Sequence, residues 1–402
     1  MQYSNARYEV YICDSTGARV APLNDADTNQ FISMRIVRSL GVVGACTITF
    51  TGGAQQPSFL PLLERYGALK KDVILEIWRT SGRIRSLLLD TVWFVRTVTR
   101  SMNENGVITI TIVAQDTLYL LSSRVCLDLY SLHPGEQNQL VYTGTISEIM
   151  SQLVYENNAL SYAAYNRTIP NFRTDLVSFN DLLDPAISPS GEISIDVTKR
   201  NLLEALQQLS NMSISYRIPI YFDVVASAAD SFMFQLYPNQ RGIDRRAIDG
   251  DGSAAIIGST TGVIREITTT VDWTDEVTAI IPWGQNGSNT FGFVTDPIFP
   301  VTAFATPYSW REAVSDSSTN TSADAQQVAI GELNNRRGTW NISATLQETS
   351  DFLFGQNWSY GDRVYINAFG NIVDTRISAI EITVENKQEI IRIALSTTEN
   401  VV

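Results

Sequence analysis

Side chains that commonly carry catalysis or hold metals are scarce in this 402-residue sequence. Its single histidine, His133, lies in the turn sequence His133-Pro134-Gly135, which is more typical of a solvated loop than of a catalytic base. One histidine also excludes metal centres that take two histidines from one chain. No G-x-S-x-G nucleophile elbow occurs, and no lysine follows a glycine, so a Walker A phosphate loop is excluded as well.

Three weaker motifs have surroundings that do not favour chemistry. Gly250 to Ala255 (GDGSAA) matches a loose dinucleotide fingerprint, but no hydrophobic strand precedes it and no helix follows. Asp249 and Asp251 lack the further alternating oxygen ligands of a calcium loop, so a solvated turn is favoured. A glycosidase needs only two carboxylates, and among 42 acidic residues the sequence selects no pair.

The aromatic residues are abundant enough to suggest sugar-stacking platforms, with seven tryptophans and sixteen tyrosines. Trp78 and Trp93, however, lie inside strand patterns, where core or subunit-interface positions are expected. We therefore predict a protein that is not an enzyme. No catalytic, cofactor-binding or metal-binding residue is assigned, and no cofactor is expected.

Composition indicates a folded, β-rich chain of two to four domains, because 44% of the residues are hydrophobic and only 18% are charged. The net charge is -13 and is uneven: residues 1 to 125 hold 13 basic and 10 acidic residues, and the remainder holds 16 and 32. No dense cluster of Lys and Arg is present, so tight binding to duplex DNA is not expected.

The cellular setting is inferred from cysteines and from missing targeting signals. Cys13, Cys46 and Cys126 are odd in number, widely spaced and in apolar contexts, as expected for buried thiols made in a reducing cytosol. The first residues do not form a secretory signal, and no run of about 18 apolar residues predicts a membrane segment.

Residues 1 to 125 alternate apolar and polar side chains in the two-residue period of half-buried strands. Turn sequences at residues 14–17 and 103–106 end in glycines that can take positive φ. A short helix is expected around Phe59 to Tyr66. We predict an N-terminal tube-like β-barrel or sandwich domain with strands at residues 8–12, 47–50, 73–78, 87–98 and 108–112.

Residues 126 to 258 mix helical and strand patterns and are predicted to form an α+β middle domain. Thr145-Ile146-Ser147-Glu148 is a capping box that begins one helix. A second helix is expected over Thr198 to Leu209, followed by strands at residues 218–225 and 232–236. The stretch from Arg241 to Gly262 is rich in Gly, Asp and Ser, and we place a domain boundary near residue 258.

Residues 259 to 402 are predicted to form a C-terminal β-rich domain with the strands of a second tube-like barrel, which could be shared with residues 190–240. Strand patterns cover residues 263–271 and 277–283, and a helix is expected over Ser322 to Asn335 after an exposed polar loop. A final hairpin spans residues 380–395 across Glu385 to Gln388. The fold class is thus α+β and mainly β, with tube-like antiparallel barrels or sandwiches around a mixed middle domain.

Several segments, in their order over residues 8 to 395, resemble the baseplate or tail-tip hub proteins of tailed phages, especially siphophages. Asp116 and Arg124 belong to a strand-to-helix fragment that is similar to one in this family, and Arg167 follows the capped helix in the same way. The segments that carry the resemblance are residues 107–127, 148–167, 201–209, 237–245 (YPNQRGIDR), 277–284, 309–314, 324–337 and 358–364 (WSYGDRV), with the closing hairpin.

The resemblance implies a homotrimer in which each chain contributes two tube-like barrels, so that six barrels match a hexameric tail tube. Such a hub joins the tail tube to a fibre or spike and lines the channel for DNA ejection. The implied partners are further copies of the chain, the distal tail protein or tail tube, and a fibre, spike or tape-measure protein. DNA would pass without specific binding, because an acidic wall repels phosphate.

The implied location is the virion, at the tail tip or baseplate, after assembly in the host cytoplasm. Hubs of many such phages carry long C-terminal fibre or cell-wall enzyme extensions, whereas this sequence stops at Val402 soon after the final hairpin. Any enzyme or receptor binder is therefore expected to be another chain. The alternative is a tail-associated protein that binds or cleaves carbohydrate, which predicts an open aromatic groove with a carboxylate pair.

Overall fold

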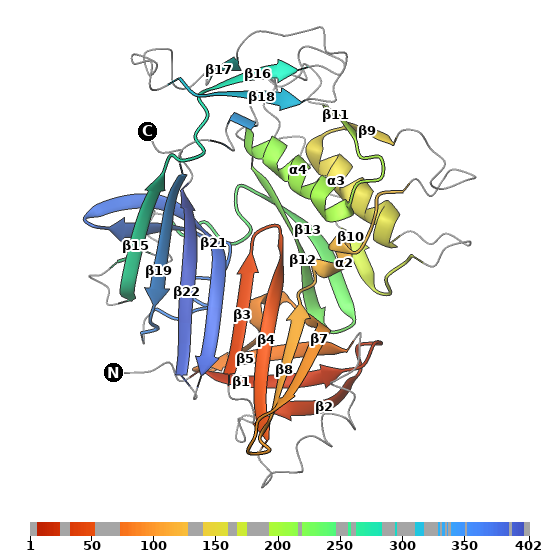
Figure 1. Cartoon of the computed structure of the whole chain (residues 1–402), viewed down its shortest axis with the longest axis vertical. Helices are drawn as coiled ribbons and strands as arrows, with labels where there is room; N and C mark the ends of the chain where they lie inside the picture. The colour runs from red at the N-terminus through yellow and green to blue at the C-terminus, as the bar shows by residue number, and fades with distance from the viewer. Residues whose placement is uncertain are drawn as a thin grey trace.

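The computed structural model is dominated by antiparallel β-sheet, with three α-helices packed beside it in the described part of the chain (Figure 1). None of these helices has the length and hydropathy needed to cross a membrane. The predicted fold class, mainly β with a mixed middle segment, is confirmed. The structure describes residues 6–24, 33–52, 73–127, 140–159, 167–174, 193–215, 219–246, 256–258, 263–283, 294–295, 310–316, 329, 332–333, 336, 339–349, 352–385 and 388–397.

The N-terminal segment folds as alternating strands joined by the predicted turns. The Asp14 side chain accepts hydrogen bonds from the N–H groups of Thr16 and Ala18, and Gly17 has a φ of 86° at the turn between β1 and β2. Gly106, with a φ of 73°, makes the corresponding turn between β7 and β8. The strands are β1 (Arg7–Cys13), β2 (Arg19–Asn24), β3 (Ser33–Ser39), β4 (Val42–Gly52), β5 (Ile74–Ser81), β6 (Ile84–Leu87), β7 (Trp93–Met102) and β8 (Ile108–Gln115).

The C-terminal segment adds a second set of strands. The final hairpin is confirmed, since Glu385 pairs with Gln388 at the end of β21 and the start of β22. The strands are β14 (Ile256–Ile257), β15 (Ile264–Asp272), β16 (Ala279–Trp283), β17 (Val294–Thr295), β18 (Glu312–Asp316), β19 (Thr339–Leu346), β20 (Arg363–Ala368), β21 (Asn371–Glu385) and β22 (Gln388–Thr397).

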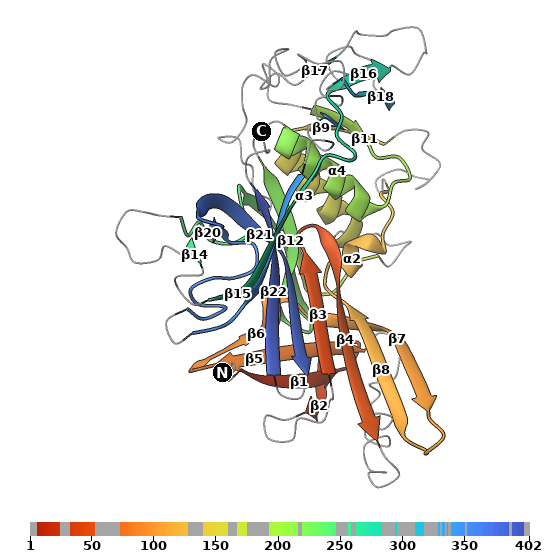
Figure 2. The same ribbon diagram turned by 60° about the vertical axis from the view of Figure 1, so that its left-hand side comes forward.

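One continuous sheet joins the two ends of the chain. Its order is β15-β19-β22-β21-β3-β4-β8-β7-β5-β1-β2, with β20 also paired to β21. Strand β21 makes the connection because residues 371–376 pair with β20 and residues 379–385 pair with β3 (Figure 2). A single hydrophobic cluster lies behind this sheet, with Ile36 and Ile48 beside Ile382 and Ile393. The C-terminal strands thus pair with the N-terminal segment, and the predicted boundaries at 125 and 258 stay predictions.

The middle segment packs helices against a small sheet. Helix α3 (Ile146–Val154) begins with the predicted capping box, in which Thr145 and Glu148 bond each other's backbone N–H groups. Helix α4 (Leu202–Ser215) starts four residues later than predicted, because the Asn201 side chain accepts from the N–H groups of Leu203 and Glu204. The remaining elements are α2 (Tyr119–Ser122), a π-helix (Tyr155–Ala159), β9 (Val141–Gly144), β10 (Phe172–Thr174), β11 (Ile193–Asp196), β12 (Ile220–Ala228) and β13 (Ser231–Pro238).

The strand predicted over residues 87–98 is interrupted. A 3-10 turn occupies Leu88–Asp90, and Leu89 and Asp90 take left-handed φ values of 58° and 50°. This conformation is costly for residues other than glycine. It is held because Leu88 and Leu89 are buried and the Leu89 carbonyl accepts a hydrogen bond from Arg38. Buried contacts thus outweigh the strand pattern here.

Other predictions have mixed outcomes. The three cysteines are buried and free, as expected. Trp93 is a core residue, whereas Trp78 is half-buried and its ring is in contact with the guanidinium groups of Arg19 and Arg85. The predicted helix at residues 59–66, His133, the calcium and dinucleotide motifs at residues 249–255, and most of the helix at 322–335 lie outside the described residues.

Candidate functional site: an outer sheet face and a charged junction behind it

The outer face of the long sheet carries hydroxyl side chains in regular register. Thr49 of β4 pairs with Thr111 of β8, which in turn pairs with Thr99 of β7. The residues between them, such as Ile48 and Ile110, are buried on the inner face. The outward threonines of these strands are Thr47, Thr49, Thr51, Thr97, Thr99, Thr109 and Thr111.

This face continues across the connection between the two ends of the chain. Ser39 of β3 pairs with Ala379 of β21, and from there the row runs through Ala394 to Ser343 of β19 and Thr268 of β15. The row is made of small uncharged side chains. The outer face from β15 to β7 is therefore one wall rich in hydroxyl groups, which also carries charged side chains, Glu266 and Glu385 among them.

One ion cluster interrupts this wall. Arg35 of β3 makes two bonds to the Glu381 carboxylate, with Nε to Oε1 at 3.1 Å and Nη2 to Oε2 at 3.0 Å. Arg392 of β22 lies on the other side, with Nη1 3.2 Å from Glu381 Oε1. The hydrogen bond from Arg35 lowers the pKa of Glu381, against the opposing effect of partial burial. Both arginines are thus held by one carboxylate that lies on the strand between them.

Removing this carboxylate is predicted to have a small, pH-dependent effect. E381Q should reduce the free energy of unfolding by less than about 1 kcal/mol at pH 7, because both arginines are largely exposed. A carboxylate with a lowered pKa stabilises the fold above its ordinary value of 4.5, and that stability is lost as the pH falls further. Urea unfolding of both proteins between pH 7 and pH 3 should therefore show the difference shrinking at acid pH. E104Q, in the exposed β7–β8 turn, is the control and should show no difference at either pH.

Behind this wall, a fully buried arginine joins the N-terminal and middle segments. Arg38 Nε lies 3.0 Å from Asp116 Oδ2, and its Nη2 lies 2.7 Å from Asp223 Oδ1 on β12. Its Nη1 donates to the Leu89 carbonyl at 2.6 Å. Burial lowers the pKa of Arg38, but attraction to Asp223 and Asp116 outweighs burial and raises it. For Asp116 the balance is different: burial disfavours the charged carboxylate and raises its pKa, although the attraction of Arg38 opposes that rise.

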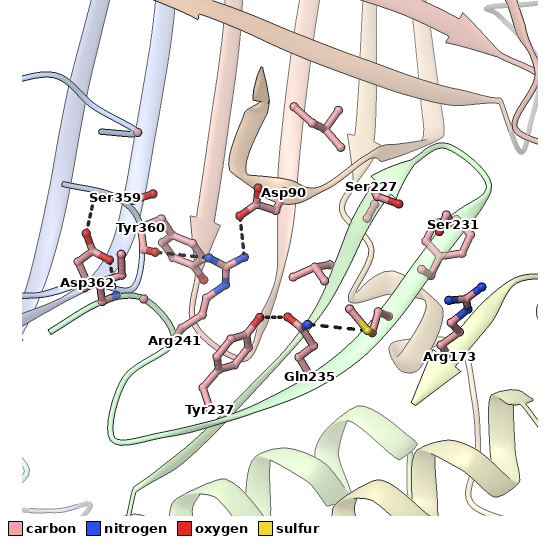
Figure 3. A pocket seen from close by; sticks show the side chains of 18 of the residues that line it. Asp90, Arg173, Ser227, Ser231, Gln235, Tyr237, Arg241, Ser359, Tyr360 and Asp362 are labelled. Atoms are coloured by element: carbon pink, nitrogen blue, oxygen red, sulfur yellow. Dashed lines mark hydrogen bonds and ion pairs between the residues drawn. The ribbon is translucent and has the colours of Figure 1, made fainter. Parts of the chain in front are cut away.

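A second buried arginine extends the network toward the C-terminal segment. Arg241 Nε lies 2.5 Å from Asp223 Oδ2, so Asp223 stands between two guanidinium groups. The Arg241 guanidinium also lies 4.9 Å from the centre of the Tyr360 ring and 3.6 Å from Asp90 (Figure 3). Burial raises the pKa of Tyr360, against the attraction of Arg38. The network thus brings all three predicted segments to one point.

A carboxylate of the C-terminal segment completes the junction. Asp362 accepts from Arg245 Nε at 2.5 Å, from the Ile243 N–H at 2.7 Å and from the Ser359 N–H at 2.8 Å. Gly242 lies against it, and a Cβ there would be 2.1 Å from Asp362 Oδ1. The middle segment can approach this carboxylate so closely only because residue 242 has no side chain.

An open pocket of about 630 Å³ lies over this junction (Figure 3). Several of its polar side chains are already engaged: Asp90 with Arg241, Asp362 with Arg245, and the Tyr237 hydroxyl with Gln235. The lining residues include Asp90, Arg173, Ser227, Ser231, Gln235, Tyr237, Arg241, Arg245, Ser359, Tyr360 and Asp362.

The chemistry that this arrangement offers is ion pairing between segments. Asp116, whose pKa burial raises, is fully buried against Arg38 and does not line the pocket. Within the described residues, no group of three or more His, Cys, Asp or Glu side chains is placed to hold a metal ion. The junction is therefore best described as a connection between segments.

The structure assigns contacts to the residues that carried the family resemblance. Asp116 binds Arg38, Asp362 binds Arg245, and Arg167 donates to the Val125 carbonyl next to Arg124. The sequence patterns and the family resemblance did not identify Arg38 or Asp223, which lie at the centre of the network. A usable signal exists for Arg38, because it is a charged residue on the otherwise apolar inward face of β3. Asp223 gives no such signal, because it alternates with Phe222 and Val224 and shares its face of β12 with Tyr221 and Ser227, as an outward polar residue would.

Comparison with known proteins gives the class of this fold. Residues 245–395 match the family model described as Siphovirus ReqiPepy6 Gp37-like protein. The chain is also similar to the 43 kDa tail protein of prophage MuSo2 from Shewanella oneidensis, with a TM-score of 0.58, 12% identity, and coverage of 98% of this chain and 99% of that one. The predicted resemblance to the siphophage tail-tip family is confirmed. The chain also resembles the tail protein from Neisseria meningitidis MC58, with a TM-score of 0.56, 12% identity and coverage of 97% and 96%.

A similar fold is also present in one component of a VgrG complex. The chain is similar to a chain of the Francisella PdpA-VgrG complex, with a TM-score of 0.51 and 10% identity, over 99% of this chain and 54% of that chain. No curated protein matches this sequence. At such low identities the likeness concerns the path of the backbone, and the roles of individual residues rest on the contacts described above.

Proposed function

We propose that this tail protein is a structural hub of the tail tip or baseplate, a homotrimer that joins the hexameric tail tube to a distal fibre or spike. In this proposal the chain is not an enzyme, and three copies form a ring around the channel through which DNA leaves. Its fold is supported by the match over residues 245–395 and by tail proteins that align along nearly their whole length.

The observation that carries the proposal is the outer face of the long sheet. One uninterrupted sheet combines strands of both ends of the chain, and its outward side chains are mostly threonine, serine and alanine. A wall of this kind suits the inside of a channel, because hydroxyl groups keep it hydrated and the side chains are too short to obstruct the passage.

The charges on the outer face of the long sheet also support its assignment to the channel wall. Strong electrostatic retention of DNA depends on unpaired Lys or Arg side chains, each of which releases counterions when it contacts a phosphate. Arg35 and Arg392 on this face are instead held by Glu381. We infer that DNA sliding past this wall meets few cationic sites that could retain it, while the net charge of -13 adds general repulsion.

The proposal is tested first by mass and shape. The chain has a mass of 44.6 kDa, so mass photometry of the purified protein should show a species near three times that value. Negative-stain images of this species should show a ring with a central hole. A compact particle without a hole, at any concentration or after mixing with tail tubes, would contradict the proposal.

The position of the wall is tested by labelling. The native cysteines are buried, so a maleimide-gold label should attach selectively to Cys introduced at Ala45, an exposed position of β4 on this face. Gold should appear at the rim of the hole. The matched control, Val20→Cys on β2, is also exposed but lies outside this face, and its label should appear at a larger radius. Equal radii for both labels would contradict the assignment of the face.

A further inference from the structure

Three arginines outside the junction are brought together where α2 approaches the start of α4 (Figure 1). Arg124 follows α2 and Arg200 precedes α4, and their backbones are linked, because the Leu202 N–H donates to the Arg124 carbonyl and the Cys126 N–H donates to the Arg200 carbonyl, both at 2.9 Å. Arg167 enters from the segment after α3, and its Nη2 donates to the Val125 carbonyl at 2.9 Å. We call these three residues the arginine cluster.

Among the residues that the structure describes, no carboxylate compensates this cluster. Within the described part of the chain, none of its members forms an ion pair, in contrast to the arginines of the junction. Arg167 also donates to the Asn157 side chain at 3.2 Å, and Arg200 donates to Gln208, but both of these acceptors are neutral. Arg124 Nε and Arg167 Nη1 are inaccessible to solvent and have no hydrogen-bond partner.

Two of the positive charges, those of Arg124 and Arg167, lie close enough to repel each other. Burial lowers the pKa of Arg167, and the charge of Arg124 lowers it further. Burial raises the pKa of the Cys126 thiol between them, while Arg167 and Arg200 oppose that rise. Unpaired buried donors and mutually repelling cations are both unfavourable. A bound anion with several acceptor oxygens would relieve both costs at once.

We propose that the arginine cluster is an oxyanion-binding site that accepts a single carboxylate-like group. A duplex phosphate backbone fits poorly, because these guanidinium groups are partly buried and do not extend along a surface as a basic stripe. In the assembled particle the oxyanion is a carboxylate of a neighbouring polypeptide, a statement that rests on the proposed hub function. Residues 126–402 hold 32 acidic and 16 basic residues, so a second copy of the chain offers many such groups.

Arg124→Gln is the variant that tests the site, because the Arg124 guanidinium donates no hydrogen bond to another described residue and its loss relieves repulsion. The probe is sodium sulfate, compared with sodium chloride at equal ionic strength. Sulfate should raise the thermal unfolding temperature of the wild-type chain saturably, and R124Q should weaken the apparent sulfate affinity about tenfold or more, as expected for one charge-assisted bond. The matched control, R83Q, removes an exposed arginine and should leave the sulfate response unchanged.

Two measurements answer two separate questions. The sulfate effect on thermal unfolding tests whether the site exists, and self-assembly in mass photometry tests whether a polypeptide supplies the anion. If sulfate stabilises the wild-type chain no more than chloride does, or stabilises R124Q equally, the site is overturned, whatever the oligomeric state. If the sulfate effect is present and R124Q also weakens self-assembly in mass photometry while R83Q does not, a polypeptide carboxylate is supported. If R124Q loses the sulfate effect but assembles like the wild-type chain, the oxyanion site stands and the polypeptide source is overturned. The hub proposal is judged separately, by ring formation of the wild-type chain.

Discussion

Replacing Asp223 by Asn is expected to cost about 3–5 kcal/mol of unfolding free energy. Asp223 is the one carboxylate that contacts both Arg38 and Arg241 among the described residues, at 2.7 Å and 2.5 Å. Asn has nearly the same volume, so packing is preserved. The variant therefore isolates the cost of leaving buried guanidinium groups short of negative charge.

The experiment is urea unfolding of the purified chain at neutral pH, with two comparisons. D244N removes a carboxylate whose partner, Arg246, is partly solvent-exposed, and should cost less than about 1 kcal/mol. R241M combined with D223N should recover part of the loss, because Asp116 still compensates Arg38 and the second buried cation is gone. Equal costs for D223N and D244N would show that the network does not hold the segments together.

Gly242→Ala is expected to cost a similar amount, about 3–5 kcal/mol, through sterics and the loss of a buried ion pair. An added Cβ would lie 2.1 Å from Asp362 Oδ1 and 2.7 Å from the Asp362 nitrogen, so backbone must move. That movement separates Asp362 from Arg245 and from the Ile243 N–H. The connection between middle and C-terminal segments should therefore loosen.

Gly370→Ala is the matched control for this substitution. Gly370 has a φ of 90° and nothing within 4 Å of an added Cβ, so only conformational strain of about 1 kcal/mol is expected. Urea unfolding gives the magnitude for both variants. Hydrogen exchange should additionally show faster opening of residues 359–363 in G242A alone. A G242A protein as stable as G370A would contradict the tight approach seen at Asp362.

The sequence alone predicted the features that depend on residues close to one another along the chain. The capping box at Thr145 predicted the start of α3, because both partners of the box lie within one helical turn. Turn residues at 14–17 and 103–106 predicted two hairpins, and the alternation of buried and outward residues predicted most of the long strands. The order of such fragments also carried the resemblance to tail-tip proteins, which the comparisons confirm.

Only the tertiary structure decided how these pieces meet. Alternation along β21 predicts a strand, but it does not say that one half pairs with β20 and the other with β3, since strand pairing depends on backbone groups that every residue shares. The same holds for Asp223 and Arg38, which are 185 residues apart, and for the arginine cluster, which draws on three separate segments. Which charged groups form an ion pair depends on the distance between them in space, and folding sets that distance.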